Sequence, residues 1–128
     1  MPSPRVVSSW ITTTSVRAPL QEPGYKSITP GELKGKLDRG EEPVLLDVRE
    51  PWEFALARIE GSRLVPMNEV LDRLPELDPA TETIVVCHHG ARSAFVTQAL
   101  DRYGLEAAYN LEGGLDAYSM VDGSVPRY

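Results

Sequence analysis

Two short apolar runs constrain the fold of this chain more than any other feature of its sequence. Residues 44–46 read Val-Leu-Leu and end at Asp47, and residues 83–86 read Thr-Ile-Val-Val and end at Cys87. A strand with one face in solvent alternates apolar and polar residues, whereas a strand of a parallel sheet is covered on both faces and is apolar throughout. The two runs therefore predict central strands of a parallel sheet.

Helical segments separate the expected strands. Thr29 is expected to cap one of them, with Pro30 in the first turn and Glu32 completing a capping box. Strands that alternate with helices over about 100 residues predict an α/β fold with a mainly parallel sheet. The other expected elements are strands at 25–28, 64–65 and 107–110, and helices at 52–58, from Asn68 (Val70, Leu71 and Leu74 inward), at 93–103 (Val96, Ala99, Leu100 and Tyr103 inward) and after Gly113 (Leu115, Tyr118 and Met120).

We expect one domain over residues 25–128, preceded by an irregular arm at residues 1–24. The arm is rich in proline, serine and threonine and shows no helical periodicity. An organelle transit peptide at residues 1–21 is the alternative, because this stretch is basic, rich in hydroxyl groups and free of acidic residues. Because this stretch lacks a clear amphipathic arginine face, an irregular arm is favoured over a transit peptide.

Composition excludes several classes of function. Thirteen Lys and Arg against 19 Asp and Glu give a net charge of −6, and duplex nucleic acid repels such a surface unless a basic patch stands out. A bilayer-spanning helix needs about 20 mostly apolar residues, and no stretch of that kind occurs. A single cysteine allows no intramolecular disulfide and favours a reducing compartment. We expect a cytoplasmic monomer with neither nucleic acid nor a membrane as its partner.

The single cysteine lies where an α/β sheet places its functional site. Such sites form beyond the carboxyl ends of strands, where Asp47 and Cys87 fall. A helix N-terminus and nearby cations favour the nucleophilic thiolate, successive N–H groups of a curled loop attract an anion, and the Arg92 guanidinium offers a planar set of donors. The candidate active-site loop comprises Cys87, His88, His89, Gly90, Ala91, Arg92 and Ser93.

Other roles, structural or metal-binding, compete with that of a nucleophile for Cys87 and the residues after it. A cysteine after a β-run is most often a small buried hydrophobe, but the polar residues 88–93 cannot continue a core. His88 and His89 taken singly are typical of solvated loop residues. A metal site is disfavoured, because consecutive ligands cannot easily surround a tetrahedral ion and no second ligand cluster is evident.

The motif Cys-x-x-Gly-x-Arg-Ser after a valine-rich strand resembles the active-site loop of single-domain rhodanese sulfurtransferases. The resemblance spans residues 25–128 and includes three further ordered blocks at 45–49, 53–61 and 110–118. One departure is the middle block, where the usual Gly-His-Ile-x-Gly-Ala is Ala-Arg-Ile-Glu-Gly-Ser at 57–62. Residues 124–128 are similar to rhodanese modules associated with sulfur-carrier activating enzymes.

This resemblance implies a five-stranded, mainly parallel sheet with helices on both faces and a sulfurtransferase that needs no cofactor. Cys87 would take a sulfane sulfur as a persulfide from thiosulfate or a protein persulfide and pass it to a thiol or cyanide. Arg92 would shape the anion pocket and Ser93 would bond within the loop. Asp47 and Arg49 would support the site. The implied partners are a small sulfur donor and acceptor, or a sulfur-carrier or thiol protein.

Two other functions compete with this one. Related phosphatases place five residues between the cysteine and the arginine, whereas four separate Cys87 from Arg92. A phosphoryl group needs the wider loop, so the count disfavours a phosphatase. A non-catalytic rhodanese-like binding or regulatory module stays open, because the retained cysteine favours an enzyme without proving turnover.

Overall fold

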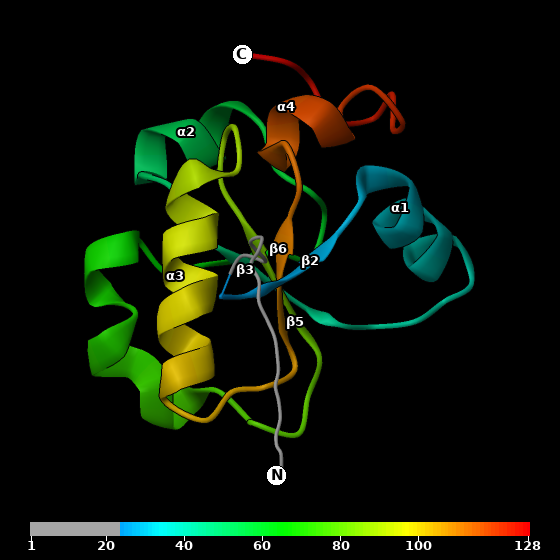
Figure 1. The fold of residues 1–128 in the computed structure, drawn as a ribbon. Coiled ribbons are helices and arrows are strands. Elements are labelled where there is room, and N and C mark those ends of the chain that lie inside the picture. The colour runs from blue at the N-terminus through cyan, green and yellow to red at the C-terminus, as the bar shows by residue number, and fades with distance from the viewer. Residues whose placement is uncertain (1–23) are drawn as a thin grey trace, which may run out of the picture.

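Five parallel strands form the sheet of the computed structural model, which describes residues 24–128 (Figure 1). Their order across the sheet is β2-β6-β5-β3-β4, and every neighbouring pair is parallel. The expected arm at residues 1–24 lies outside the described residues, Gly24 excepted. The strands are β2 (Lys26–Ile28), β3 (Val44–Asp47), β4 (Arg63–Leu64), β5 (Thr83–Val86) and β6 (Ala108–Leu111).

Helices cover both faces of this sheet, so the predicted α/β architecture is confirmed. Figure 1 shows α3 on one side of the sheet and α1 on the other. Ile84 and Val86 of β5 pack with α1 and α4, whereas Val85 between them packs with α3, as the alternation of side chains along a strand requires. The helices are α1 (Pro30–Asp38), α2 (Pro51–Leu56), α3 (Ala91–Arg102) and α4 (Gly114–Tyr118), with 3-10 segments at Met67–Glu69 and Leu71–Glu76.

Local sequence signals account for the start of α1 and the end of α3. The Thr29 hydroxyl accepts a hydrogen bond from the Glu32 N–H (3.1 Å), and the Glu32 carboxylate accepts one from the Thr29 N–H (2.9 Å). Gly104, with φ of +95°, follows the last turn of α3, as a glycine after a helix end commonly does. The predicted capping box at Thr29 is confirmed.

Three expected core positions are wrong. The segment after Asn68 forms two 3-10 turns instead of one α-helix, because Pro75 has no N–H to donate to a helical ladder, and Leu71 is left 50% exposed. Tyr103 and Met120 lie just beyond the ends of α3 and α4, where the chain departs from the helix, and both are exposed.

The topology brings residues distant in sequence to one end of the sheet. Asp47 and Val86 are neighbours in the register of β3 and β5, and Val85 is opposite Asn110 of β6. The carboxyl ends of three central strands therefore meet beside Cys87. Among residues 24–128, no helix has the length and apolar character required to cross a bilayer.

Candidate active site

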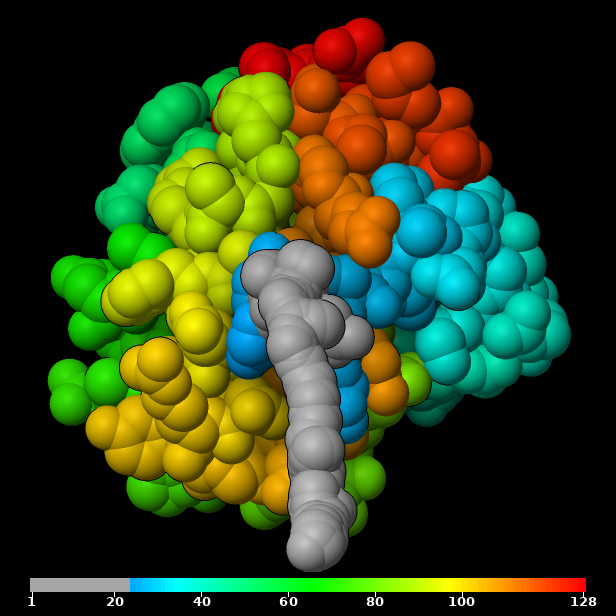
Figure 2. Space-filling model, in the orientation of Figure 1, coloured from blue at the N-terminus to red at the C-terminus, as the bar shows by residue number. Residues whose placement is uncertain are grey.

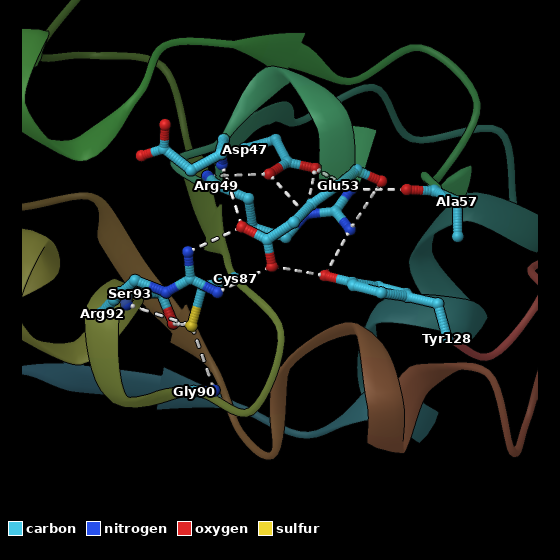
Figure 3. A network of polar contacts seen from close by, with 10 residues as sticks. Asp47, Arg49, Glu53, Ala57, Cys87, Gly90, Arg92, Ser93 and Tyr128 are labelled. Atoms are coloured by element: carbon cyan, nitrogen blue, oxygen red, sulfur yellow. Dashed lines mark hydrogen bonds and ion pairs between the residues drawn. The ribbon is translucent and has the colours of Figure 1, made fainter. Parts of the chain in front are cut away.

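The loop from Cys87 to Ser93 curls around the cysteine sulfur between β5 and α3. The N–H groups of Gly90 (3.1 Å) and Ser93 (3.3 Å) both donate to Sγ, as Figure 3 shows. Gly90 has φ of +101°, a left-handed conformation that favours glycine and allows the loop to close. Cys87 is only 1% exposed. The loop therefore surrounds the sulfur with backbone donors at the N-terminus of a twelve-residue helix.

The first turn of α4 holds this loop from one side. The N–H of Leu115 donates to the Cys87 carbonyl (2.7 Å), and the N–H of Asp116 donates to the His88 carbonyl (3.0 Å). Gly114 allows this approach, because a Cβ atom at this position would lie 2.5–2.6 Å from the same two carbonyl oxygens. In the space-filling view, the yellow-green loop, orange α4 and red C-terminal residues gather at one end of the molecule (Figure 2).

Ser93 contacts the sulfur through its side chain as well as its backbone. Its Oγ lies 3.2 Å from Cys87 Sγ and donates to Asn110 Oδ1 at 2.5 Å. Because a hydroxyl carries one proton, a serine that donates to Asn110 accepts from a Cys87 thiol. A thiolate would instead draw the serine proton to itself. Asn110 is a site residue that sequence reasoning missed as such, although it lies in one of the blocks that carry the rhodanese resemblance.

Arg92 forms a bidentate ion pair with Glu53 of α2. Its Nη1 and Nη2 atoms lie 2.8 and 2.9 Å from the two carboxylate oxygens. Glu53 is 3% exposed. The Arg92 guanidinium, helped by hydrogen bonds from the Glu50 N–H and the Tyr128 hydroxyl, lowers the pKa of Glu53 from 4.5 to about 2. The positive charge expected to shape the anion pocket is thus compensated by a carboxylate.

Asp47 and Arg49 form a second ion pair, with both side chains fully buried. The Arg49 Nε and Nη2 atoms donate to the carboxylate oxygens at 2.8 and 2.7 Å. Arg49 also donates to the carbonyls of Ala57 and Glu53, and so fastens α2 to the end of β3. These contacts fit the supporting role expected for Asp47 and Arg49.

Tyr128 joins the two ion pairs and was missed as a site residue by sequence reasoning. Its hydroxyl accepts from Arg49 Nη1 and donates to Glu53 Oε2, both at 2.8 Å (Figure 3). The only signal for it was the similarity of residues 124–128 to rhodanese modules of sulfur-carrier activating enzymes. Nothing in the local sequence there indicates a contact with residues 75 and 79 positions earlier.

The two histidines stack against one another at the edge of the loop. The rings of His88 and His89 lie 3.9 Å apart, and the other stacking partner of His88 is Tyr128 at 4.1 Å. The His89 side chain is 67% exposed, with its Nδ1 3.9 Å from Asp116 Oδ2. Neither histidine bonds to the sulfur.

The arrangement suits a nucleophilic cysteine. Two N–H donors and a hydroxyl converge on Sγ, and both guanidinium groups of the site are held in place by carboxylates. Within residues 24–128, no group of three or more histidine, cysteine, aspartate or glutamate side chains is placed to hold a metal ion.

The Rhodanese-like domain family model matches residues 29–120. The chain is 36% identical over 111 residues to "Rhodanese-like/PpiC domain-containing protein 12, chloroplastic" of Arabidopsis thaliana, covering 80% of this chain and 37% of that protein. It is 34% identical over 93 residues to "Putative sulfurtransferase YtwF" of Bacillus subtilis, covering 73% of this chain and 89% of that protein. This chain thus spans about a third of the Arabidopsis relative and nearly all of the Bacillus relative.

A solved structure agrees with the fold. The rhodanese-like domain protein from Staphylococcus aureus superimposes with a TM-score of 0.71 at 35% identity, over 80% of this chain and 98% of that one. The likeness therefore extends over almost all of a separately solved domain.

Proposed function

This chain belongs to the rhodanese-like domain family, and on that premise we propose that it is a sulfurtransferase in which Cys87 carries a sulfane sulfur as a persulfide. The observation that supports the proposal is the pair of backbone N–H groups, from Gly90 and Ser93, that converge on Cys87 Sγ. Donors aimed at a sulfur stabilise the anionic form that attacks and the anionic persulfide that results.

The first half of the reaction loads the sulfur onto the enzyme. The Cys87 thiolate attacks the outer sulfur of thiosulfate, a new S–S bond forms, and the original S–S bond breaks as sulfite leaves with its electron pair. A persulfide on another protein can serve as the donor in the same way, with a thiolate as the leaving group. Neither form of the step requires a cofactor.

The second half returns the enzyme to its starting state. A nucleophile, either cyanide or a thiolate, attacks the outer sulfur of the Cys87 persulfide. The persulfide S–S bond breaks, and its electron pair returns to Cys87 as the thiolate. Cyanide then leaves as thiocyanate, and a thiolate acceptor leaves as a new persulfide. A sulfur-carrier or thiol protein is the proposed acceptor class alongside small molecules.

The intact mass of the purified protein tests the first half directly. After incubation with thiosulfate, we expect a gain of one sulfur atom that cyanide reverses. Cys87 is the only cysteine in the sequence, so Cys87→Ser should show no gain while keeping the fold, because the exchange is nearly isosteric. The circular dichroism spectrum and the melting temperature of the variant provide the control.

Each outcome of this experiment assigns a different role to the site. A gain from a protein persulfide but not from thiosulfate would make the chain a relay between proteins. No gain from any sulfane donor would overturn the proposal and leave a rhodanese-like binding module. A gain of sulfur in Cys87→Ser would exclude Cys87 as the carrier.

A further inference from the structure

Tyr128 lies at the meeting point of the two ion pairs of the site. Its hydroxyl accepts a hydrogen bond from Arg49 and donates one to Glu53 Oε2, the same oxygen that accepts from Arg92 Nη2 at 2.9 Å. A phenol can donate and accept at once, so a single side chain connects the buried Asp47–Arg49 pair with the Glu53–Arg92 pair. Tyr128 is therefore linked to Arg92 through one oxygen of the Glu53 carboxylate.

The ring of Tyr128 contacts the active-site loop directly. It stacks on His88, the residue after the cysteine, at a centroid distance of 4.1 Å and an interplanar angle of 14°. Trp52 of α2 meets its edge at 6.4 Å, and the Arg49 guanidinium lies 5.3 Å from the ring centroid. The loop is thus held by an aromatic stack as well as by the first turn of α4.

Packing alone explains the ring of Tyr128 but leaves the hydroxyl unexplained. The side chain is partly buried against the core cluster of α1 and α4, a position that phenylalanine would fill equally well. The hydroxyl is hydrogen-bonded to two charged side chains, those of Arg49 and Glu53. Burial and the neighbouring Glu53 carboxylate, opposed by Arg49, raise the pKa of Tyr128 to about 12. The hydroxyl therefore keeps its proton and stays a donor to Glu53 throughout the neutral range.

We infer that Tyr128 is a positioning residue for sulfur loading: its hydroxyl fixes the Glu53 carboxylate that orients Arg92, and its ring fixes His88. The inference rests on the proposed transfer of sulfur through Cys87. It assigns a function to a residue that lies 41 positions after the cysteine and makes no hydrogen bond to Cys87 Sγ.

Tyr128→Phe and Tyr128→Leu separate the hydroxyl from the ring. The measurement is the rate of persulfide formation from thiosulfate, followed by quenched-flow intact mass at a temperature at which each variant is fully folded. Tyr128→Phe keeps the stack and loses the hydroxyl, so we expect loading to slow by about tenfold, the lower end for a hydrogen bond to a charged group. Tyr128→Leu should slow it further. Tyr103→Phe, which removes an exposed tyrosine hydroxyl, is the matched control and should load at the wild-type rate.

A double-mutant cycle distinguishes positioning through Glu53 from a general loss of stability. If Tyr128 acts through the Glu53 carboxylate, Tyr128→Phe should change the loading rate little in a Glu53→Gln background, whereas independent effects would multiply. Multiplying effects, or wild-type loading by Tyr128→Phe, would overturn the inference. Failure of the wild-type protein to load any donor would instead overturn the proposed function, so the two failures are distinguishable.

Discussion

At the scale of single residues, Glu53 sets the charge of the site. Its carboxylate is buried and takes hydrogen bonds from Arg92, Tyr128 and the Glu50 N–H. Arg49, the second guanidinium of the site, faces Asp47 in the same way. The proposed donor thiosulfate, which carries two negative charges, would meet two arginines that are already paired with carboxylates. The backbone N–H groups of the loop therefore contribute more to its stabilisation than they would beside an unpaired arginine.

Glu53→Gln should change how the stability of the protein depends on pH. The pKa of Glu53 is held at about 2 in the folded state, against an ordinary value of 4.5. The ionised carboxylate thus stabilises the fold above about pH 4.5, by about 3 kcal/mol, and this contribution is lost as the pH falls towards 2. We expect the gap in unfolding free energy between wild type and Glu53→Gln to narrow over that range.

Urea unfolding followed by circular dichroism at several pH values between 6 and 2 measures this gap. The other carboxylates are common to both proteins, so their titrations cancel in the difference. Glu60→Gln, at an exposed position, is the control and should run parallel to wild type. A Glu53→Gln curve that also runs parallel to wild type would show that the ion pair with Arg92 contributes no pH-dependent stability.

At the scale of elements, the turn that begins α4 determines how closely β6 can approach the active-site loop. Gly114→Ala should therefore damage both stability and sulfur loading. The residue has φ of +64°, and the added Cβ would lie 2.5 Å from the His88 carbonyl oxygen and 2.6 Å from that of Cys87. Backbone strain and overpacking each cost about 1–3 kcal/mol, and the loop that holds the sulfur must move to relieve them.

Gly104→Ala is the matched control for that prediction. Gly104 has φ of +95°, but an added Cβ there would have nothing within 4 Å, so only backbone strain is incurred. We expect Gly104→Ala to lower the free energy of unfolding by less than Gly114→Ala and to leave the loading rate of folded protein unchanged. Equal losses in the two variants would mean that contact with the loop carries no special cost.

Elements with local signals were predictable from the sequence, and contacts between elements were not. Neighbouring residues alone specify the capping box at Thr29 and the apolar runs of β3 and β5. The loop after Cys87 is contiguous too, so its members could be named. The pairing of Arg92 with Glu53 spans 39 positions and depends on where α2 lies over the end of the sheet. No pattern within either segment specifies that arrangement.

At the scale of the whole molecule, the net charge of −6 opposes the approach of an anionic donor. In the proposed loading step a Cys87 thiolate attacks thiosulfate, a dianion, so repulsion should slow loading at low ionic strength. Added salt screens such repulsion. We therefore expect the second-order rate of loading by thiosulfate to rise as sodium chloride is increased from about 10 mM, where the screening length is about 30 Å, to about 100 mM, where it is about 10 Å.

Alkylation of Cys87 by iodoacetamide, which carries no charge, is the control for the salt dependence. It reports changes in the reactivity of the thiolate without the repulsion between donor and protein, and we expect it to change little with salt. A thiosulfate rate that falls with salt would reveal a local attraction at the site that outweighs the net charge.

The backbone donors around Cys87 have a consequence for how such a site can diversify. An N–H group is present whichever side chain its residue bears, proline excepted, so the cradle of the sulfur is largely independent of the chemistry displayed around it. The side chains of His89 and Ala91 project from the loop at exposed positions without bonding to the sulfur. Substitutions at these two positions can therefore change the surface beside the loop while the backbone donors to the sulfur stay in place.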